Sequence, residues 1–96
     1  MASTNDYLEY ILDLFKDLDD ISYKKMMGEY ILYINGKIFG GIYDNRLLIK
    51  KDILPDYLNL DEEIPYPSAK PMYFIDTDNK EVLNNIIEII SKLLEK

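Results

Sequence analysis

Hydrophobic residues recur at helical spacing at both ends of the 96-residue chain and alternate with polar residues in its centre. A first helix is predicted from a cap at Ser3 or Thr4 to about Leu18. Its apolar stripe is Tyr7, Leu8, Ile11, Leu14, Phe15 and Leu18. Asp78 followed by Glu81 resembles a capping box and predicts the start of a last helix. The apolar face of that helix is Val82, Leu83, Ile86, Ile87, Ile90, Leu93 and Leu94.

Turn-forming residues divide the centre of the chain into short strands. Asn35-Gly36 and Asp44-Asn45 each separate two apolar runs. Both central residues of a type I′ turn need positive φ angles, which Asn, Asp and Gly tolerate best. Gly28 marks a break or bulge, and Gly40-Gly41 permits a bulge or close packing. Strands are therefore predicted over residues 20–26, 29–34, 37–43 and 46–50.

The segment after residue 50 has a weaker pattern. Pro55 suits the first turn of a short helix over residues 52–57. The acidic run Asp61, Glu62, Glu63 is followed by prolines and predicts a loop. A fifth strand is expected over residues 71–75, where Pro71 fits the first position or a sheet edge.

A two-residue turn at Asn35-Gly36 fixes a register in which Leu32 faces Phe39. Because side chains alternate across a strand, two faces follow. The first is almost wholly apolar and is predicted to be core: Ile31, Tyr33, Ile38, Ile42, Leu47 and Ile49. The second mixes aromatic residues with cations: Tyr30, Leu32, Ile34, Lys37, Phe39, Tyr43, Arg46, Leu48 and Lys50.

This order of elements predicts an α+β fold for one domain spanning residues 1–96. N- and C-terminal helices should flank a mainly antiparallel sheet of about five strands. The residues expected to be buried are Leu14, Ile31, Ile38, Ile42, Leu47 and Ile86.

Charge is unevenly distributed along the chain. The net charge is −7, yet the segment from Asp20 to Lys51 holds six cations and three anions, which leaves −10 for the rest. Nucleic-acid affinity rests on phosphate neutralisation, so the acidic balance argues against direct nucleic-acid binding. The N-terminus has no secretory pattern and no apolar run could span a bilayer, so we expect a cytoplasmic protein without membrane contact.

The composition excludes several kinds of chemistry. The chain has neither cysteine nor histidine, so thiolate nucleophiles, thiolate metal sites and histidine-based triads are ruled out. The run from Asp76 to Asp78 lacks the glycine and the distal glutamate of a calcium loop, because Glu81 and Ile87 hold those positions. We therefore expect no enzyme activity, no catalytic residues, no metal site and no cofactor.

One set of motifs carries a family resemblance. Its parts are Met26-Met27-Gly28, Tyr30 and Tyr33, Asn35-Gly36-Lys37-Ile38-Phe39, Arg46-Leu47-Leu48-Ile49-Lys50, and Lys70-Pro71-Met72-Tyr73. These residues resemble the N-terminal domain of the TfoX family, bacterial competence regulators also called Sxy. The chain departs from the family pattern at Met27, where an aromatic residue is usual, and at Glu29 and Ile31, which replace small residues.

The resemblance implies a two-layer, secretion-chaperone-like α+β fold of a kind that often dimerises. It also implies a role in the transcription of competence genes with a cyclic-AMP receptor protein, and no established enzyme activity. Full-length members carry a second, C-terminal domain that resembles helix-hairpin-helix modules. The chain is expected to be a standalone N-terminal domain.

The mixed face supplies the candidate functional site, which consists of Tyr30, Phe39, Tyr43, Arg46 and Lys50. Aromatic residues and arginine are typical anchors of protein interfaces. Three readings stay open: the last helix covers this face, a protein partner or a second copy forming a homodimer covers it, or it binds nucleic acid.

The leading hypothesis is a non-enzymatic regulatory domain that binds a protein of the transcription machinery or self-associates. A direct nucleic-acid binder that uses the basic segment from Asp20 to Lys51 is the second hypothesis. A small-ligand binder or enzyme, with a pocket between the sheet and the segment from Lys51 to Ala69, is the third.

Overall fold

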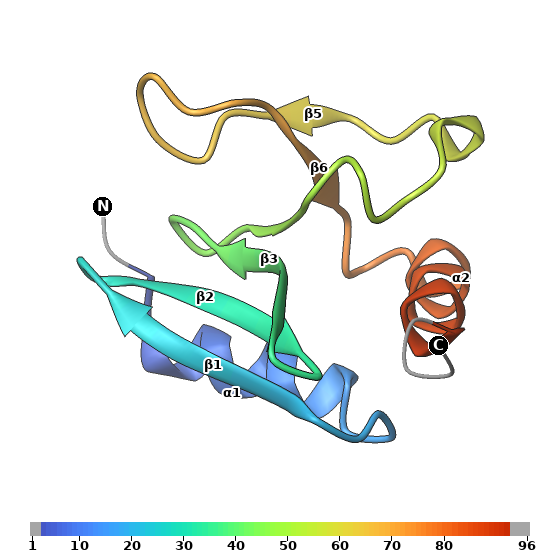
Figure 1. Ribbon diagram of the computed structural model, residues 1–96, viewed down its shortest axis with the longest axis horizontal. Helices are drawn as coiled ribbons and strands as arrows, with labels where there is room; N and C mark the ends of the chain where they lie inside the picture. The colour runs from blue at the N-terminus through green and yellow to red at the C-terminus, as the bar shows by residue number, and fades with distance from the viewer. Residues whose placement is uncertain (1–2, 93–96) are drawn as a thin grey trace.

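The computed structural model describes residues 3–92 of the chain. Its elements follow in the order α1 (Asn5–Leu14), β1 (Ile21–Met26), β2 (Glu29–Ile34), β3 (Lys37–Ile42), β4 (Leu47–Ile49), a 3₁₀ helix η1 (Asp56–Leu58), β5 (Glu62–Glu63), β6 (Met72–Ile75) and α2 (Lys80–Ser91). Figure 1 shows α1 behind β1 and β2, and α2 following the end of β6. No helix within residues 3–92 is both long and apolar enough to cross a membrane.

The strands form one antiparallel sheet in the order β1-β2-β3-β4-β6-β5. Both helices pack on the same face of this sheet, because a single cluster of buried residues joins them to alternate strand positions. From α1 and α2 the cluster takes Leu8, Ile11, Phe15, Leu83, Ile86 and Ile90. The expected α+β fold is confirmed, and it has two layers: one of helices and one of strands.

Several element boundaries differ from those predicted. Thr4 caps α1 by accepting a hydrogen bond from the Tyr7 amide, but the helix ends at Leu14 and not at Leu18. The α2 helix is capped by Asn79, whose side chain accepts from the Val82 amide, and not by Asp78. The last predicted residues of its apolar face, Leu93 and Leu94, lie outside the described residues.

The middle of the chain differs most from the sequence prediction. The predicted short helix over residues 52–57 is instead a turn followed by η1. Glu62 and Glu63, predicted to lie in a loop, form the two-residue edge strand β5, and they pair with Tyr73 and Met72. The sheet therefore has six strands, and its two outer edges are β1 and β5.

Three successive two-residue turns join the first four strands. The two predicted turns are confirmed, since Asn35, Gly36, Asp44 and Asn45 all have positive φ angles between 52° and 79°. A third turn joins β1 to β2 at Met27-Gly28, where Met27 has φ 52° and Gly28 has φ 83°. The sequence predicts a break or bulge at Gly28, whereas the structure has a turn in which Met27 is also left-handed.

A β-bulge in β3 changes which side chains share a face. Ile34 faces Lys37 and Tyr33 faces Ile38, as predicted, but Leu32 faces Gly40 and not Phe39. Phe39 is therefore the extra residue, and from Gly40 onward β3 is shifted by one position relative to β2. A one-residue shift moves side chains to the opposite face of a sheet. Ile42 consequently lies on the same face as Tyr30 and Leu32.

The two glycines after the bulge are required by close packing. A Cβ on Gly40 would lie 2.4 Å from the Leu48 carbonyl oxygen, and one on Gly41 would lie 2.6 Å from the Tyr43 ring and 2.8 Å from the Tyr30 carbonyl oxygen. Such distances are too short for any side chain. The expectation that Gly40-Gly41 permits a bulge or close packing is confirmed on both counts.

The bulge makes the predicted core face partly wrong. Ile42, Leu47 and Ile49 are fully buried under the helices, as predicted. Ile31 and Tyr33, however, are only half-buried, and Ile38 is 46% exposed, because these three lie on the opposite face. Two other residues were expected to be buried. Ile86 is fully buried, whereas Leu14 is partly buried and packs at the margin of the core.

Glu29 connects the start of the chain to two of the hairpins. Its carboxylate accepts hydrogen bonds from the backbone amide and hydroxyl of Ser3, at 2.9 and 2.6 Å, and from the Asp44 amide at 3.1 Å. The Asn45 amide donates to the Ser3 hydroxyl, and the Asn45 side chain accepts from the Thr4 amide. These bonds hold the Met27-Gly28 turn beside the Asp44-Asn45 turn.

The face assignment predicts unequal costs for two adjacent truncations. Phe39→Ala should lower the free energy of unfolding by about 3–5 kcal/mol, because the ring is fully buried against Phe15. Ile38→Ala should lower it by less than about 1 kcal/mol, because that side chain is 46% exposed. Urea unfolding of both variants checks the prediction, and a larger loss for Ile38→Ala would show the faces to be reversed.

A second prediction concerns the Glu29 hydrogen bonds. Glu29→Gln removes the charge that three donors share, so the free energy of unfolding should fall by about 1–2 kcal/mol. Glu88→Gln is the matched control, since Glu88 is an exposed helix residue whose partner Lys92 lies 3.9 Å away. Its effect should stay within about 0.5 kcal/mol. Equal losses in the two variants would contradict the role given to Glu29.

Candidate interaction surface

The five predicted site residues do not share one face. Tyr30 and Phe39 are buried on the face that the helices cover, and the Phe39 ring packs against Phe15 at the end of α1, not against the last helix. Tyr43 and Lys50 line a groove on the opposite face. Arg46 donates from Nε to the Tyr43 carbonyl oxygen and forms a salt bridge with Glu63 of β5. The prediction of a single mixed face was wrong, because the bulge at Phe39 separates the residues on either side of it.

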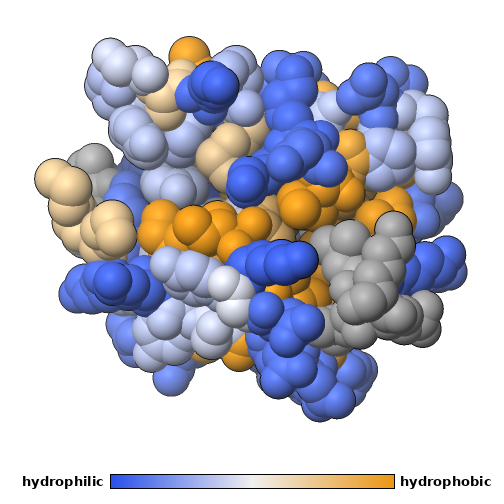
Figure 2. All heavy atoms as spheres, viewed as in Figure 1, coloured by the Kyte–Doolittle hydropathy of each residue, from blue (hydrophilic) through white to orange (hydrophobic). Residues whose placement is uncertain are grey.

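The face of the sheet opposite the helices is the open face. Alternation along the strands places on it Ile31, Tyr33, Ile38, Gly41, Tyr43, Leu48, Met72 and Phe74. The loop between β5 and β6, residues 64–71, lies over part of this face, because Tyr66 contacts Tyr43 and Pro65 lines the same grooves. In Figure 2, apolar residues form a band across the middle of the visible surface, between polar flanks.

Tyr43, Pro65 and Tyr66 form a ridge across the open face. The rings of Tyr43 and Tyr66 are 6.2 Å apart between centroids, and the Tyr43 ring lies directly over Gly41. Burial raises the pKa of Tyr43, and the neighbouring Tyr66 and Glu29 raise it further. The Tyr43 hydroxyl therefore stays neutral at neutral pH, as suits a residue at the base of an apolar surface. Tyr66 is 59% exposed and forms the outer part of the ridge.

The Met groove runs along one side of this ridge, between the β1–β2 hairpin and the loop. It has a volume of about 660 Å³ and is lined by Met26, Met27, Glu29, Ile31, Tyr43, Pro65 and Tyr66. The only ionisable carboxylate of the lining, Glu29, is already engaged by Ser3 and Asp44. The groove therefore offers apolar and aromatic contacts and little free charge.

The Lys groove lies on the other side of the ridge, with a volume of about 690 Å³. It is lined by Tyr43, Lys50, Lys51, Asp52, Pro65, Tyr66, Ala69, Lys70, Pro71 and Met72. Lys51 pairs with Glu62 at 3.0 Å, and this bond raises the pKa of Lys51. Lys50 and Lys70 take part in none of the salt bridges found within residues 3–92. Asp52 of the lining is in none of those salt bridges either, so two cations and one carboxylate remain to meet a partner.

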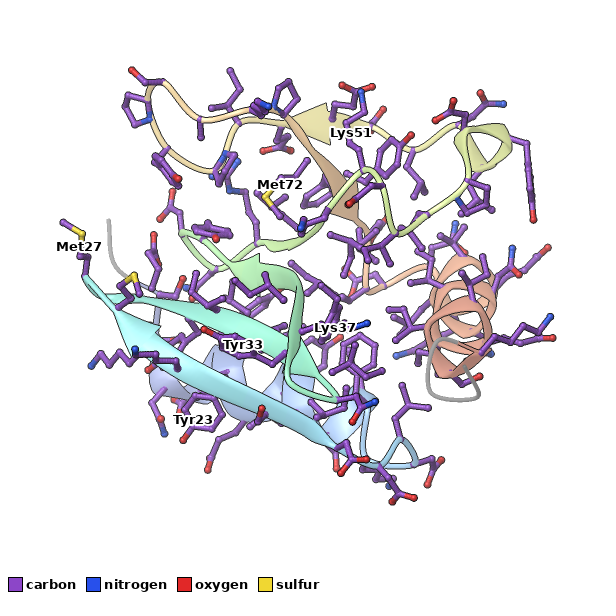
Figure 3. All side chains as sticks on the ribbon, in the orientation of Figure 1. Tyr23, Met27, Tyr33, Lys37, Lys51 and Met72 are labelled. Carbon is purple, nitrogen blue, oxygen red and sulfur yellow. The ribbon has the colours of Figure 1, made fainter. Side chains whose placement is uncertain are left out.

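Met27 is the most exposed large apolar side chain of this surface. It is 96% exposed at the tip of the β1–β2 hairpin, and Figure 3 shows it projecting away from the body of the protein. Its φ angle of 52° lies in the left-handed region, where residues with a Cβ are strained. Met26, Ile64 and Tyr66 are also between 46% and 59% exposed. Exposed apolar side chains around a groove are typical of a binding surface.

This arrangement suits binding better than acid-base chemistry. No group of three or more acidic side chains that could hold a metal occurs within residues 3–92. Asp56 accepts a 2.8 Å hydrogen bond from the Tyr73 hydroxyl. This bond raises the pKa of Tyr73. The expectations of no metal and no cofactor stay predictions.

Sequence reasoning missed Met27, Pro65 and Tyr66 as parts of the site. The sequence does contain a turn signal at Met27. This residue follows a predicted strand and precedes a glycine, which is the pattern of the first residue in a two-residue turn. Pro65 and Tyr66 gave no such signal, because only the fold brings their loop over β3. The Lys groove does occupy the position expected for a pocket, between the sheet and the segment from Lys51 to Ala69.

Comparison with known proteins places the chain in a family. The family model of the TfoX N-terminal domain matches residues 13–82, from the end of α1 to the first turn of α2. An uncharacterised 12.7 kDa protein in the trpE 5′ region of Spirochaeta aurantia is 32% identical over 78 residues, which cover 79% of this chain and 68% of that protein. The resemblance seen in the hairpin motifs is confirmed: the chain belongs to the TfoX N-terminal domain family.

Proposed function

We propose that this domain is a non-enzymatic, cytoplasmic protein-binding module whose open face holds a segment of a partner protein. The observation that carries the proposal is Met27, a 96% exposed apolar side chain in a left-handed conformation at the rim of the Met groove. Asparagine or glycine would suit this turn position better. A methionine here costs backbone strain and gains almost no contact within the fold, so a contact outside the fold would account for it.

The grooves define the chemistry of the partner. The Met groove offers Met, Ile, Tyr and Pro side chains, which suit an apolar or aromatic anchor. The Lys groove adds Lys50 and Lys70, which suit an acidic residue a short distance along the same segment. The segment of the partner that binds here therefore has an apolar anchor residue followed by acidic residues. Membership of the TfoX family directs the search for this partner to the transcription machinery, as a regulatory role would require.

The Lys groove also supports a second candidate function. Its volume of about 690 Å³ lies within the range of small-molecule sites, about 300–1,000 Å³. A small anionic molecule with an apolar body would match its lysines and its apolar lining.

Lys70→Ala separates the two functions: a small-molecule site should lose its ligand entirely, whereas a protein partner anchored in the Met groove should bind about tenfold more weakly.

The open-face proposal predicts opposite effects of Met27→Asn on stability and on binding. Stability should be unchanged or rise by up to about 1 kcal/mol, because asparagine tolerates the left-handed conformation. Recovery of the partner should fall about tenfold or more, because an interface anchor is lost. The measurement is quantitative affinity capture from the native host, with RNA polymerase and receptor-protein components followed explicitly.

The matched control is Tyr57→Asn, which removes a 76% exposed aromatic side chain that lines neither groove. Its partner recovery should equal that of the unaltered domain. Equal recovery with Met27→Asn and with Tyr57→Asn would contradict a binding role for the Met groove.

A further prediction concerns nucleic acids. Duplex and single-stranded DNA should bind more weakly than about 10⁻⁵ M at physiological salt, because few phosphate contacts are available to a chain of net charge −7. Fluorescence anisotropy at two salt concentrations checks this. Sub-micromolar binding with a steep salt dependence would instead favour the basic segment from Asp20 to Lys51 as a nucleic-acid surface.

A further inference from the structure

We propose that two copies of this chain associate through the free edge of β1, antiparallel and related by a twofold axis at Ser22. The two sheets would then form one continuous sheet. The contact is centred on Ser22, and residues 19–25 line neither groove, so the inference is tested independently of the proposed function.

The β1 strand presents an unpaired edge. It is the outermost strand of the sheet, six residues long, and every residue after Ile21 is exposed. The Asn35 amide donates to the Asp20 carbonyl oxygen at 3.0 Å. This bond shows which residues of β1 form hydrogen-bonded pairs with β2 and which do not. Because hydrogen-bonded pairs alternate along antiparallel strands, the backbone groups of Ile21, Tyr23 and Lys25 point away from β2. Such an edge is a template for another strand.

The charges around this edge are self-complementary. The sequence reads Asp19-Asp20-Ile21-Ser22-Tyr23-Lys24-Lys25, with two carboxylates at one end, two ammonium groups at the other and an uncharged serine midway. An antiparallel pair centred on Ser22 brings Asp19 and Asp20, the turn residues just before β1, to the end of the second copy's strand that carries Lys24 and Lys25. The twofold axis repeats this approach, so opposite charges meet at both ends of the pair. Opposite charges facing each other across strands are stabilising.

The outward backbone groups are compatible with this register, and the charges select it from the other pairings that those groups allow. Pairing centred on Ser22 sets Ile21 opposite Tyr23 of the second copy, and both of these residues have outward-pointing backbone groups. Centring on Lys24 would set the two Lys24 side chains against each other, which is destabilising. A parallel pair would bring like charges together at both ends. Lysines usually protect an edge strand from pairing, but here they favour one specific pairing.

An exposed aromatic side chain lies along the same edge. Tyr23 is 49% exposed and packs edge-on against Tyr30, with ring centroids 5.9 Å apart. Figure 3 shows its side chain at the β1 border of the molecule. In the proposed dimer, Ile21 of the second copy would cover the free side of this ring, as an aliphatic–aromatic cross-strand pair.

Charge reversal tests the proposal by mass and by complementation. Sedimentation equilibrium of the unaltered chain should give twice the 11.3 kDa chain mass at about 100 μM. The double variant Lys24→Glu/Lys25→Glu makes both ends of the edge acidic. The double variant Asp19→Lys/Asp20→Asn leaves neither end acidic. Each variant alone should dissociate at least about tenfold more readily than the unaltered chain. Asparagine is used at position 20 because Asp20 has φ 64°. A mixture of the two variants should form a heterodimer, because the opposite charges meet again.

Three outcomes would overturn the proposal: an unaltered chain that is monomeric at about 100 μM, variants that dimerise as tightly as the unaltered chain, or a mixture that stays monomeric. Circular dichroism establishes that each variant is folded.

A cysteine pair tests the register without altering charge at the ends. The chain has no cysteine, so Ser22→Cys introduces a single thiol. In the proposed register the two Cα atoms at position 22 would lie about 4.5 Å apart, within the span of a disulfide. Mild oxidation should therefore convert most of this variant to a covalent dimer.

Lys24→Cys is the matched control on the same strand. Its two Cα atoms would lie about 14 Å apart in the proposed register and should not cross-link. Faster cross-linking of Lys24→Cys than of Ser22→Cys would overturn the register, and failure of Ser22→Cys to cross-link would overturn the edge contact.

Discussion

The extra residue at Phe39 decides which face of the sheet the two helices cover. Before the bulge, β3 pairs with β2 as a two-residue turn at Asn35-Gly36 requires. After it, the strand is shifted by one position, so Ile42 joins Tyr30 and Leu32 on the helix side. Phe39 itself inserts toward α1, where its ring packs edge-on against Phe15. The core, and by elimination the open face, depend on this one residue.

The bulge also shapes the open face. Past Phe39 the strand places Gly41 on that side, and the absence of a side chain there admits the Tyr43 ring directly over the backbone. Tyr43 then supports Tyr66 and the loop over residues 64–71. This ridge divides the open face into the Met groove and the Lys groove. A structural feature of the core therefore produces the surface to which we assign binding.

The sequence was informative where local chemistry decides the structure. Asn35-Gly36 and Asp44-Asn45 predicted two hairpins correctly, and the helical stripes predicted both helices. The bulge could not be located from the pattern, because both faces of β2 and β3 carry apolar residues and a one-residue shift leaves both plausible. The face assignment failed at Ile31, Tyr33 and Ile38 for this reason alone.

The candidate site was less predictable than the fold. Tyr43 and Lys50 were identified, but Tyr30 and Phe39 were grouped with them through the wrong register. The role of Glu29 depends on contacts with Ser3 and Asp44, which are 26 and 15 positions away in the sequence. Contacts of that separation follow from the fold and leave no local signal. The same holds for Tyr66, which reaches Tyr43 only after β5 and β6 have paired.

The register of β2 and β3 is the most direct test of this account. Backbone and aromatic nuclear Overhauser effects in the labelled protein report it without any mutation. The account predicts contacts of Leu32 with Gly40 across the strands, and of the Phe39 ring with the Phe15 ring. Contacts of Leu32 with the Phe39 backbone, together with contacts of the Phe39 ring with Tyr66, would contradict it. That result would return the helices to the other face of the sheet.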